Sequence, residues 1–131
     1  MNAIKRTERG WAGHFILGDR CLFRRNTLLE YDNQKIVVST VGCCLDYRNE
    51  GFTNKREFIE IGYNRYYETM AFHSDLNDTV YFDIDVTKQV DFSSKWSIEE
   101  ITDTSDLEAN QMHEAVVDEI SQRLLNGVIF L

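Results

Sequence analysis

Residues 20–42, RCLFRRNTLLEYDNQKIVVSTVG, decide the fold class, because they have the pattern of two strands joined by a turn. Apolar and β-branched residues fill both segments, and the YDNQ stretch between them is typical of a hairpin loop. With this loop the numbers of facing residues sum to 65, so Glu30 faces Lys35 and Leu29 faces Ile36. Pairs of opposite charge and apolar pairs both stabilise adjacent strands. The stretch therefore predicts an antiparallel hairpin with a defined register.

A second hairpin is predicted over residues 65–86. The segments RYYETMAFHS and TVYFDIDV are rich in aromatic and β-branched residues, and they flank the turn-forming residues DLND at 75–78. In this register the numbers of facing residues sum to 153. Ile84 and Val86 then lie on a mainly apolar face, which we expect to belong to the core.

A helix is predicted over about 105–125. Ser105 and Glu108 have the spacing of a capping box, with Ser at the N-cap and Glu at N3. Apolar residues follow at helical spacing: Met112, Val116, Ile120 and Leu124. Asn126-Gly127 supplies a helix stop. The apolar tail Val128–Leu131 is expected to dock as a short strand or to lie in an interface.

The remaining segments complete an α+β architecture. Residues 11–17, WAGHFIL, predict a first strand, residues 45–56 a long polar loop, and residues 88–104 an irregular segment. We expect a single domain, 1–131, with an antiparallel sheet of about five strands and one C-terminal helix packed on a face.

Charge is divided unevenly between the two halves of the chain. Residues 1–65 carry 11 Lys and Arg against 8 Asp and Glu, whereas residues 66–131 carry 3 against 14, which gives the net charge of −8. This net charge argues against direct binding to duplex DNA. The acidic half is either an ordinary solvated surface or a surface that docks on a basic partner, as a mimic of phosphate groups.

The chain has no apolar run near the roughly 20 residues that a membrane helix needs. Its N-terminus lacks the apolar stretch of a signal peptide. Three cysteines, two of them adjacent, do not suit a secreted disulfide framework. We therefore expect a cytoplasmic protein with no membrane contact.

Basic and aromatic residues gather in the first quarter of the chain. Guanidinium groups bind phosphate with two parallel hydrogen bonds, and aromatic rings stack on bases. The candidate ligand-binding residues are Arg9, Trp11, His14, Phe15, Arg20, Arg24 and Arg25. The alternative is that these arginines pair with the chain's own acids and that the aromatic residues belong to the core.

The predicted second hairpin brings acidic residues together. Glu68 is expected directly opposite Asp85, with Asp83 two residues along the same face. Like charges at that range oppose folding unless a hard cation, a shared proton or a nearby arginine compensates them. The same three residues are the candidate partner-binding surface. They are also the candidate site of a metal-dependent enzyme.

The sequence MHEAVV around His113 lacks the second histidine of the zinc motif HExxH, because Val117 occupies its place. We expect His113 at the edge of the core with one hydrogen-bond partner. The spacing of histidines and cysteines favours neither a zinc site nor a nucleophilic cysteine, and no metal or cofactor is predicted. The cysteines are expected to be buried small apolar residues.

Three stretches carry a resemblance: RGWAGHF at 9–15, FRRNT at 23–27 and RYYETMAF at 65–72. They resemble small uncharacterised proteins of phages, prophages and plasmids. This resemblance implies a short cytosolic protein that binds and inhibits a host component.

Three functional hypotheses follow. The leading one is a non-enzymatic binding protein that holds a nucleotide-like anion at the basic and aromatic residues. The second is an acidic inhibitor that docks on a basic host protein, and the third is a metal-dependent enzyme built on the three acids. The small size and the apolar tail also suggest a homodimer.

Overall fold

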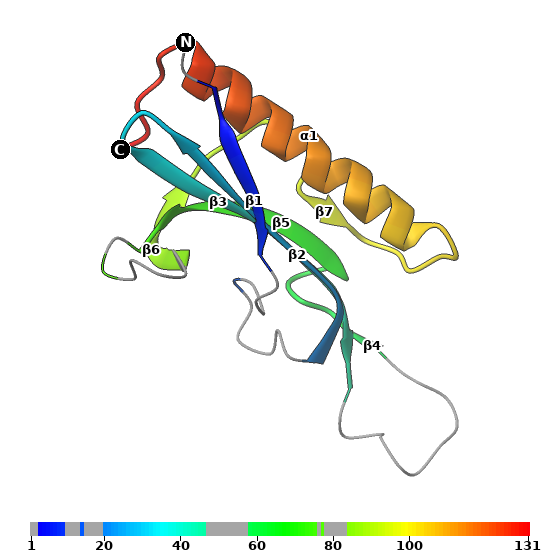
Figure 1. Ribbon diagram of the computed structural model, residues 1–131. Helices are drawn as coiled ribbons and strands as arrows, with labels where there is room; N and C mark the ends of the chain where they lie inside the picture. Colours follow the sequence, from blue (N-terminus) through cyan, green and yellow to red (C-terminus); the bar gives the residue numbers. More distant parts are fainter. Residues whose placement is uncertain (1–2, 10–13, 15–19, 47–57, 76, 78–83) are drawn as a thin grey trace.

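The computed structural model describes residues 3–9, 14, 20–46, 58–75, 77 and 84–131. In chain order its elements are β1 (Lys5–Arg9), β2 (Cys21–Tyr31), β3 (Gln34–Leu45), β4 (Phe58–Ile59), β5 (Tyr67–Ser74), β6 (Ile84–Val90), β7 (Ser97–Ile98) and α1 (Ser105–Leu125). All strands pair antiparallel in one sheet of order β1-β2-β3-β5-β6, with β4 added to β3 and β7 to β5. The helix lies across one face of this sheet (Figure 1). The α+β prediction is confirmed.

The first hairpin has the predicted register. Glu30 faces Lys35 and Leu29 faces Ile36 in the β2–β3 pair. The ladder continues to Tyr31 and Gln34, so the turn contains two residues rather than the four expected. Asp32 makes this turn with a φ of 50°, a left-handed conformation that Asp tolerates better than most residues.

The second hairpin has a different register from the prediction. Ala71 faces Val90 and Ser74 faces Ile84, with an irregularity between Phe72 and Ser74. The side chain of Val86, expected in the core, is 63% exposed. The prediction was wrong because it joined the strands by a tight loop, whereas β6 extends to Val90, inside the segment expected to be irregular.

The helix occupies the predicted range, but its start differs in detail. Thr104 is the N-cap residue and makes no side-chain capping bond, so Ser105 is not the N-cap. The Ser105 hydroxyl instead accepts a hydrogen bond from the Thr102 amide at 2.7 Å and donates to the Glu100 carbonyl.

The helix ends as predicted at Asn126-Gly127. The Val128 amide donates to the Arg123 carbonyl and the Gly127 amide to the Leu124 carbonyl. This pair of bonds is the Schellman motif, and it requires the left-handed φ of 85° that Gly127 adopts. The tail then docks on the β2–β3 turn, because Gln34 Nε2 donates to the Val128 carbonyl and Gln34 Oε1 accepts from the Phe130 amide.

The largest core cluster lies between α1 and the facing side of the sheet, and side chains on the opposite side, among them Leu28, Val37 and Val41, are also buried. The largest cluster contains Leu29, Ile36, Val38, Ala71 and Val90 from the strands and Val116, Val117, Ile120 and Leu124 from the helix. The expected strand at 11–17 lies outside the described residues except for His14, which is not in a strand. No helix in the described part of the chain is long and apolar enough to cross a membrane.

Candidate functional site

Alternation along the strands sends neighbouring polar residues to opposite faces of the sheet. Arg25, Thr40 and Thr69 face one another across β2, β3 and β5 on the side of α1. On the far side, Arg24 faces Val41 and Val41 faces Glu68. One further row on that far side contains Arg9, Asn26, Ser39 and Met70. The molecule therefore carries two separate polar networks, one on each face.

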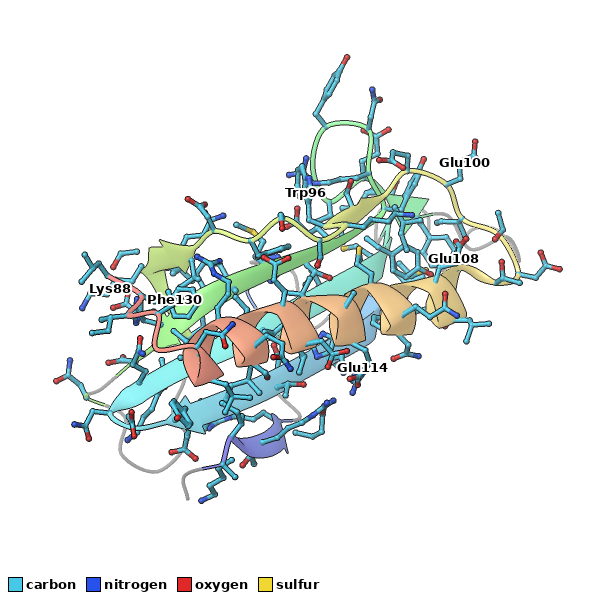
Figure 2. All side chains as sticks on the ribbon, turned by 90° about the horizontal axis from the view of Figure 1, so that it is seen from above. Lys88, Trp96, Glu100, Glu108, Glu114 and Phe130 are labelled. Atoms are coloured by element: carbon cyan, nitrogen blue, oxygen red, sulfur yellow. The ribbon has the colours of Figure 1, made fainter. Side chains whose placement is uncertain are left out.

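The network beneath the helix begins with charged groups from β1, β2 and α1. Arg25 Nη2 donates to Glu8 Oε1 at 3.1 Å and also to Glu114. Arg6 Nη1 donates to Glu114 Oε2 at 2.9 Å. Figure 2 shows Glu114 on the side of α1 that faces β2 and β1. The hydrogen bonds from Arg6 and then from Arg25 lower the pKa of Glu114 to about 2, so this carboxylate is ionised at neutral pH.

A chain of hydroxyl and imidazole groups continues this network into the core. Thr27 Oγ1 donates to Glu8 Oε1 at 2.7 Å, which uses its only proton. His113 Nε2, 2.7 Å from the same oxygen, must therefore be the protonated nitrogen. Nδ1 then accepts from Thr40 Oγ1 at 2.7 Å, and Thr40 in turn accepts from Thr69 Oγ1 at 2.7 Å. Each hydroxyl and ring nitrogen in this chain has a partner of the required kind.

His113 is buried more deeply than the sequence predicted. It is fully buried and has two hydrogen-bond partners, not one partner at the edge of the core. Burial, and then the charge of Arg25, lower its pKa to about 4, so the ring is neutral at physiological pH. This role is structural, because the ring is enclosed between the helix and the sheet.

The far face of the sheet carries the second network, centred on His14. His14 Nδ1 lies 2.9 Å from Ser39 Oγ, and His14 Nε2 lies 2.9 Å from Glu68 Oε1. Arg65 Nε donates to Glu68 Oε2 at 2.6 Å, and its guanidinium stacks on the Trp96 ring at 4.7 Å. Burial raises the pKa of Glu68, but the bonds from His14 and Arg65 outweigh it and hold the pKa below its usual value.

The order Ser39, His14, Glu68 has the composition of a hydrolase triad, in which a carboxylate orients a base that activates a nucleophile. The burial of these three side chains argues against that role. Ser39 is fully buried in the middle of β3, and the side chains of His14 and Glu68 are 4% and 7% exposed. Ser39 therefore presents no exposed surface to a substrate carbonyl in the described part of the structure, and the arrangement anchors His14 to the sheet.

Arg9 lies beside this anchor. It faces Asn26, which faces Ser39 on the next strand. The Arg9 Nη2 atom is buried and has no hydrogen-bond partner. Buried donors are nearly always paired in folded proteins, so this nitrogen marks a place where a partner group is expected.

The other predicted ligand-binding residues separate into three groups. Arg24 is exposed on the face of Arg9, and Arg20 is half-buried just before β2. Arg25 lies on the opposite face and pairs with Glu8 and Glu114, which is the alternative that the sequence left open. Trp11 and Phe15 lie outside the described residues. Binding of a ligand by these residues stays a prediction.

The predicted pairing of Glu68 with Asp85 does not form. Glu68 faces Val41 and Ser97, not Asp85. Asp85 instead accepts hydrogen bonds from the amide and hydroxyl of Thr87, and Asp83 lies outside the described residues. Within the described ranges no group of three or more His, Cys, Asp or Glu side chains could hold a metal ion. The register of β6 removes the observation on which the metal-dependent hypothesis depended.

The three cysteines are buried and have free thiols, as expected. Burial raises the pKa of Cys21 to about 12 and also raises that of Cys43, so neither thiol is an activated nucleophile. Cys43 Sγ lies 2.6 Å from the Tyr67 hydroxyl, which donates to Asp106 at 2.7 Å. Gly42 is required beside this ring, because a Cβ there would lie 2.0 Å from Tyr67 Cδ2.

Comparisons of the chain with protein-family models, with curated proteins and with solved structures give no match.

Proposed function

We propose that this protein binds a nucleotide-like anion on the face of the sheet opposite α1, and that it sequesters this host molecule without converting it. The observation that carries the proposal is the buried Arg9 Nη2 atom, which has no hydrogen-bond partner. A phosphate oxygen is the group that satisfies such a donor best, since guanidinium and phosphate match in charge and geometry.

The surroundings of Arg9 suit an anion. Arg24 adds a second, exposed guanidinium on the same face, one row along the sheet. By contrast, Arg25 and Arg6 are already engaged by Glu8 and Glu114 on the other face, so they are not part of the proposed site. Trp11 and Phe15, predicted to stack on a base, belong to the proposal on sequence grounds alone.

Sequestration is favoured over catalysis by the state of the candidate catalytic groups. Ser39 is fully buried, and the pKa values of the Cys21 and Cys43 thiols are raised. A protein with an anion-binding arginine and no accessible activated nucleophile among its described residues is suited to holding a ligand. The phage-type resemblance of the sequence agrees with this use.

The test is equilibrium binding by isothermal titration calorimetry. The probes are the mono-, di- and triphosphates of adenosine and guanosine, together with NAD. We expect at least one probe to bind, and Arg9→Ala to weaken that binding about tenfold or more, because a charge-assisted pair is lost. Arg9→Lys keeps the charge but not the two-pronged geometry, so it should restore only part of the affinity.

The matched control is Lys5→Ala. It removes one positive charge from the same strand, and Lys5 Nζ makes only an exposed ion pair with Glu30 at 3.7 Å. This variant should bind like the parent protein. The proposal is overturned if none of the probes binds, or if Arg9→Ala, with an unchanged melting temperature, binds as tightly as the parent.

A further inference from the structure

The turn before β5 presents an aromatic side chain to solvent on a fixed backbone. Tyr63 is 87% exposed, and it lies in a turn closed by the bridge between Gly62 and Arg65. The Arg65 amide donates to the Gly62 carbonyl, and the Asn64 amide donates to Glu60 Oε2 at 3.3 Å. Asn64 adopts a left-handed φ of 56°, which Asn tolerates in such turns. The backbone therefore holds Tyr63 in place while its side chain stays open to a partner.

A second aromatic side chain, Trp96, lies beside this turn and is 48% exposed. Arg65 joins the two, because its guanidinium stacks on the Trp96 ring at 4.7 Å and fills the space beside Gly62, where a Cβ would lie 2.3 Å from Arg65 Cζ. Its charge is neutralised by Glu68, whose Oε2 accepts from Arg65 Nε at 2.6 Å. Figure 2 shows the turn, in green, projecting beside the labelled Trp96. Tyr63 and Trp96 thus form one surface rather than two scattered exposed positions.

Acidic residues follow Trp96 directly. Glu99 and Glu100 are exposed, and neither forms an ion pair with another described residue. Glu99 Oε1 accepts only from the hydroxyl of Ser97, the neighbour of Trp96, at 3.1 Å. Lys95 precedes Trp96, and the chain then has no Lys or Arg until Arg123. A positively charged partner therefore finds carboxylates here that the protein's own cations leave unpaired.

The position of the helix accounts for other acids nearby but not for these two. Asp106 and Glu108 lie in the first turn of α1, where the helix dipole stabilises negative charge. Glu99 and Glu100 lie outside the helix, beyond the reach of this effect. Figure 2 shows Glu100 and Glu108 at the end of the molecule where α1 begins.

We propose that the surface of Tyr63, Trp96, Glu99 and Glu100 docks a basic segment of another protein. Arginine or lysine side chains of the partner pair with the two carboxylates, and its apolar groups pack on the two rings. Tyr and Trp are the residue types that often dominate binding at protein interfaces. Nucleic acid is disfavoured as the partner, because these carboxylates and the net charge of −8 repel phosphate. The surface shares no residue with the anion site proposed above, so neither proposal depends on the other.

The test is fluorescence anisotropy with a labelled short peptide that alternates arginine and leucine. We expect this peptide to bind and its affinity to fall steeply with added salt, because salt screens exposed charges. A peptide that alternates glutamate and leucine should not bind. The proposal is overturned if the arginine peptide does not bind at millimolar concentration, or if the glutamate peptide binds equally well.

The contribution of the aromatic residues is measured with Tyr63→Ala. The Tyr63 side chain is almost fully exposed, so this variant should keep its melting temperature while weakening peptide binding about tenfold. The matched control is Val86→Ala, which shortens a 63% exposed apolar side chain on β6 and should bind like the parent. Equal binding by Tyr63→Ala and Val86→Ala overturns the assignment of this surface.

The contribution of the carboxylates is measured with the double variant Glu99→Gln, Glu100→Gln. It should weaken binding about fivefold and reduce the dependence on salt, because two exposed charges are lost. The control Asp118→Asn, Glu108→Gln also removes two exposed carboxylates, both from α1, and should bind nearly like the parent. Equal weakening in the two double variants would show that net charge, not this surface, attracts the peptide, and would overturn the proposal.

Discussion

The two faces of the sheet receive polar residues from the same short stretches, yet they differ in how those residues are satisfied. Thr40 and Thr69 face α1 and join a chain of hydrogen bonds that reaches His113 and Glu8. Ser39 and Glu68, their neighbours in sequence, bind His14 on the far face.

Beside that second network, the Arg9 Nη2 atom stays without a partner. The comparison teaches that a polar network beneath a helix serves the fold when all its members are paired. A network beside a buried donor that has no hydrogen-bond partner is the better candidate for a ligand-binding site.

The largest effect is expected from removing the centre of the network beneath the helix. His113→Ala leaves a cavity in a fully buried position, and it leaves one hydroxyl proton of the Thr40–Thr69 pair without an acceptor. We expect the free energy of unfolding to fall by roughly 3 kcal/mol. Urea denaturation measures this change.

The control for His113→Ala is Gln111→Ala, an exposed position on the same helix. Its effect should stay within about 0.5 kcal/mol. Equal stabilities of the two variants would contradict the structural role of His113.

The next effect is a dependence of stability on pH. The folded pKa of His113 is about 4, below the ordinary value of about 6.5 that the unfolded chain has. Between these two pH values the unfolded state binds more protons, so stability falls as the pH falls. From pH 7 to pH 5 the loss should be about 2 kcal/mol from this residue.

The pH prediction is checked by urea denaturation of the parent and of His113→Gln across this pH range. The pKa of Glu114 is lowered to about 2 and those of Glu8 and Glu68 are also lowered, so these carboxylates stay ionised above pH 5. The variant should therefore lose most of the slope. Parallel curves for the two proteins would show that His113 does not titrate as described.

The smallest effect contrasts two neighbouring arginines. Arg25→Ala removes the pairs with Glu8 and Glu114, and these partly exposed pairs together should be worth about 1 kcal/mol. Arg24→Ala changes an exposed side chain on the other face and should alter stability by less than about 0.5 kcal/mol. The two variants differ only in position, so each controls for the other in thermal denaturation. A larger loss for Arg24→Ala would reverse the assignment of the two faces.

The sequence could predict the elements whose signals are local. The register of the first hairpin is set by a short turn within the chain. The helix is specified by apolar residues at helical spacing and by Gly127, which ends it. The second hairpin could not be placed in this way, because the alternating pattern TVYFDIDV suits more than one register. The register is decided by segments distant in the sequence. The prediction paired Tyr67 and Glu68 with β6, whereas in the structure β7 pairs with these two residues.

The candidate site was predictable only in part. His14 and Arg9 were identified from composition, but the contacts of His14 with Ser39 and Glu68 join residues 25 and 54 positions apart. Side chains alternate between the two faces of a strand, so the prediction of a strand over residues 20–30 could already have placed Arg24 and Arg25 on opposite faces. The polar pair Ser39-Thr40 inside the apolar run of β3 was the other available signal, because polar residues in mid-strand need partners.

The strand β1 was missed because its sequence, KRTER, contains no apolar residue. It is held instead by the bonds of Arg6 to Glu114, 108 positions away, and of Glu8 to Thr27. These five residues form one edge of the sheet, and they carry three positive charges, Lys5, Arg6 and Arg9, against Glu8.

An identical strand from another copy would bring the same excess positive charge to this edge, and the two would repel each other. The least apolar of the described strands thus disfavours pairing with a second copy at this edge, where no described strand lies beyond β1.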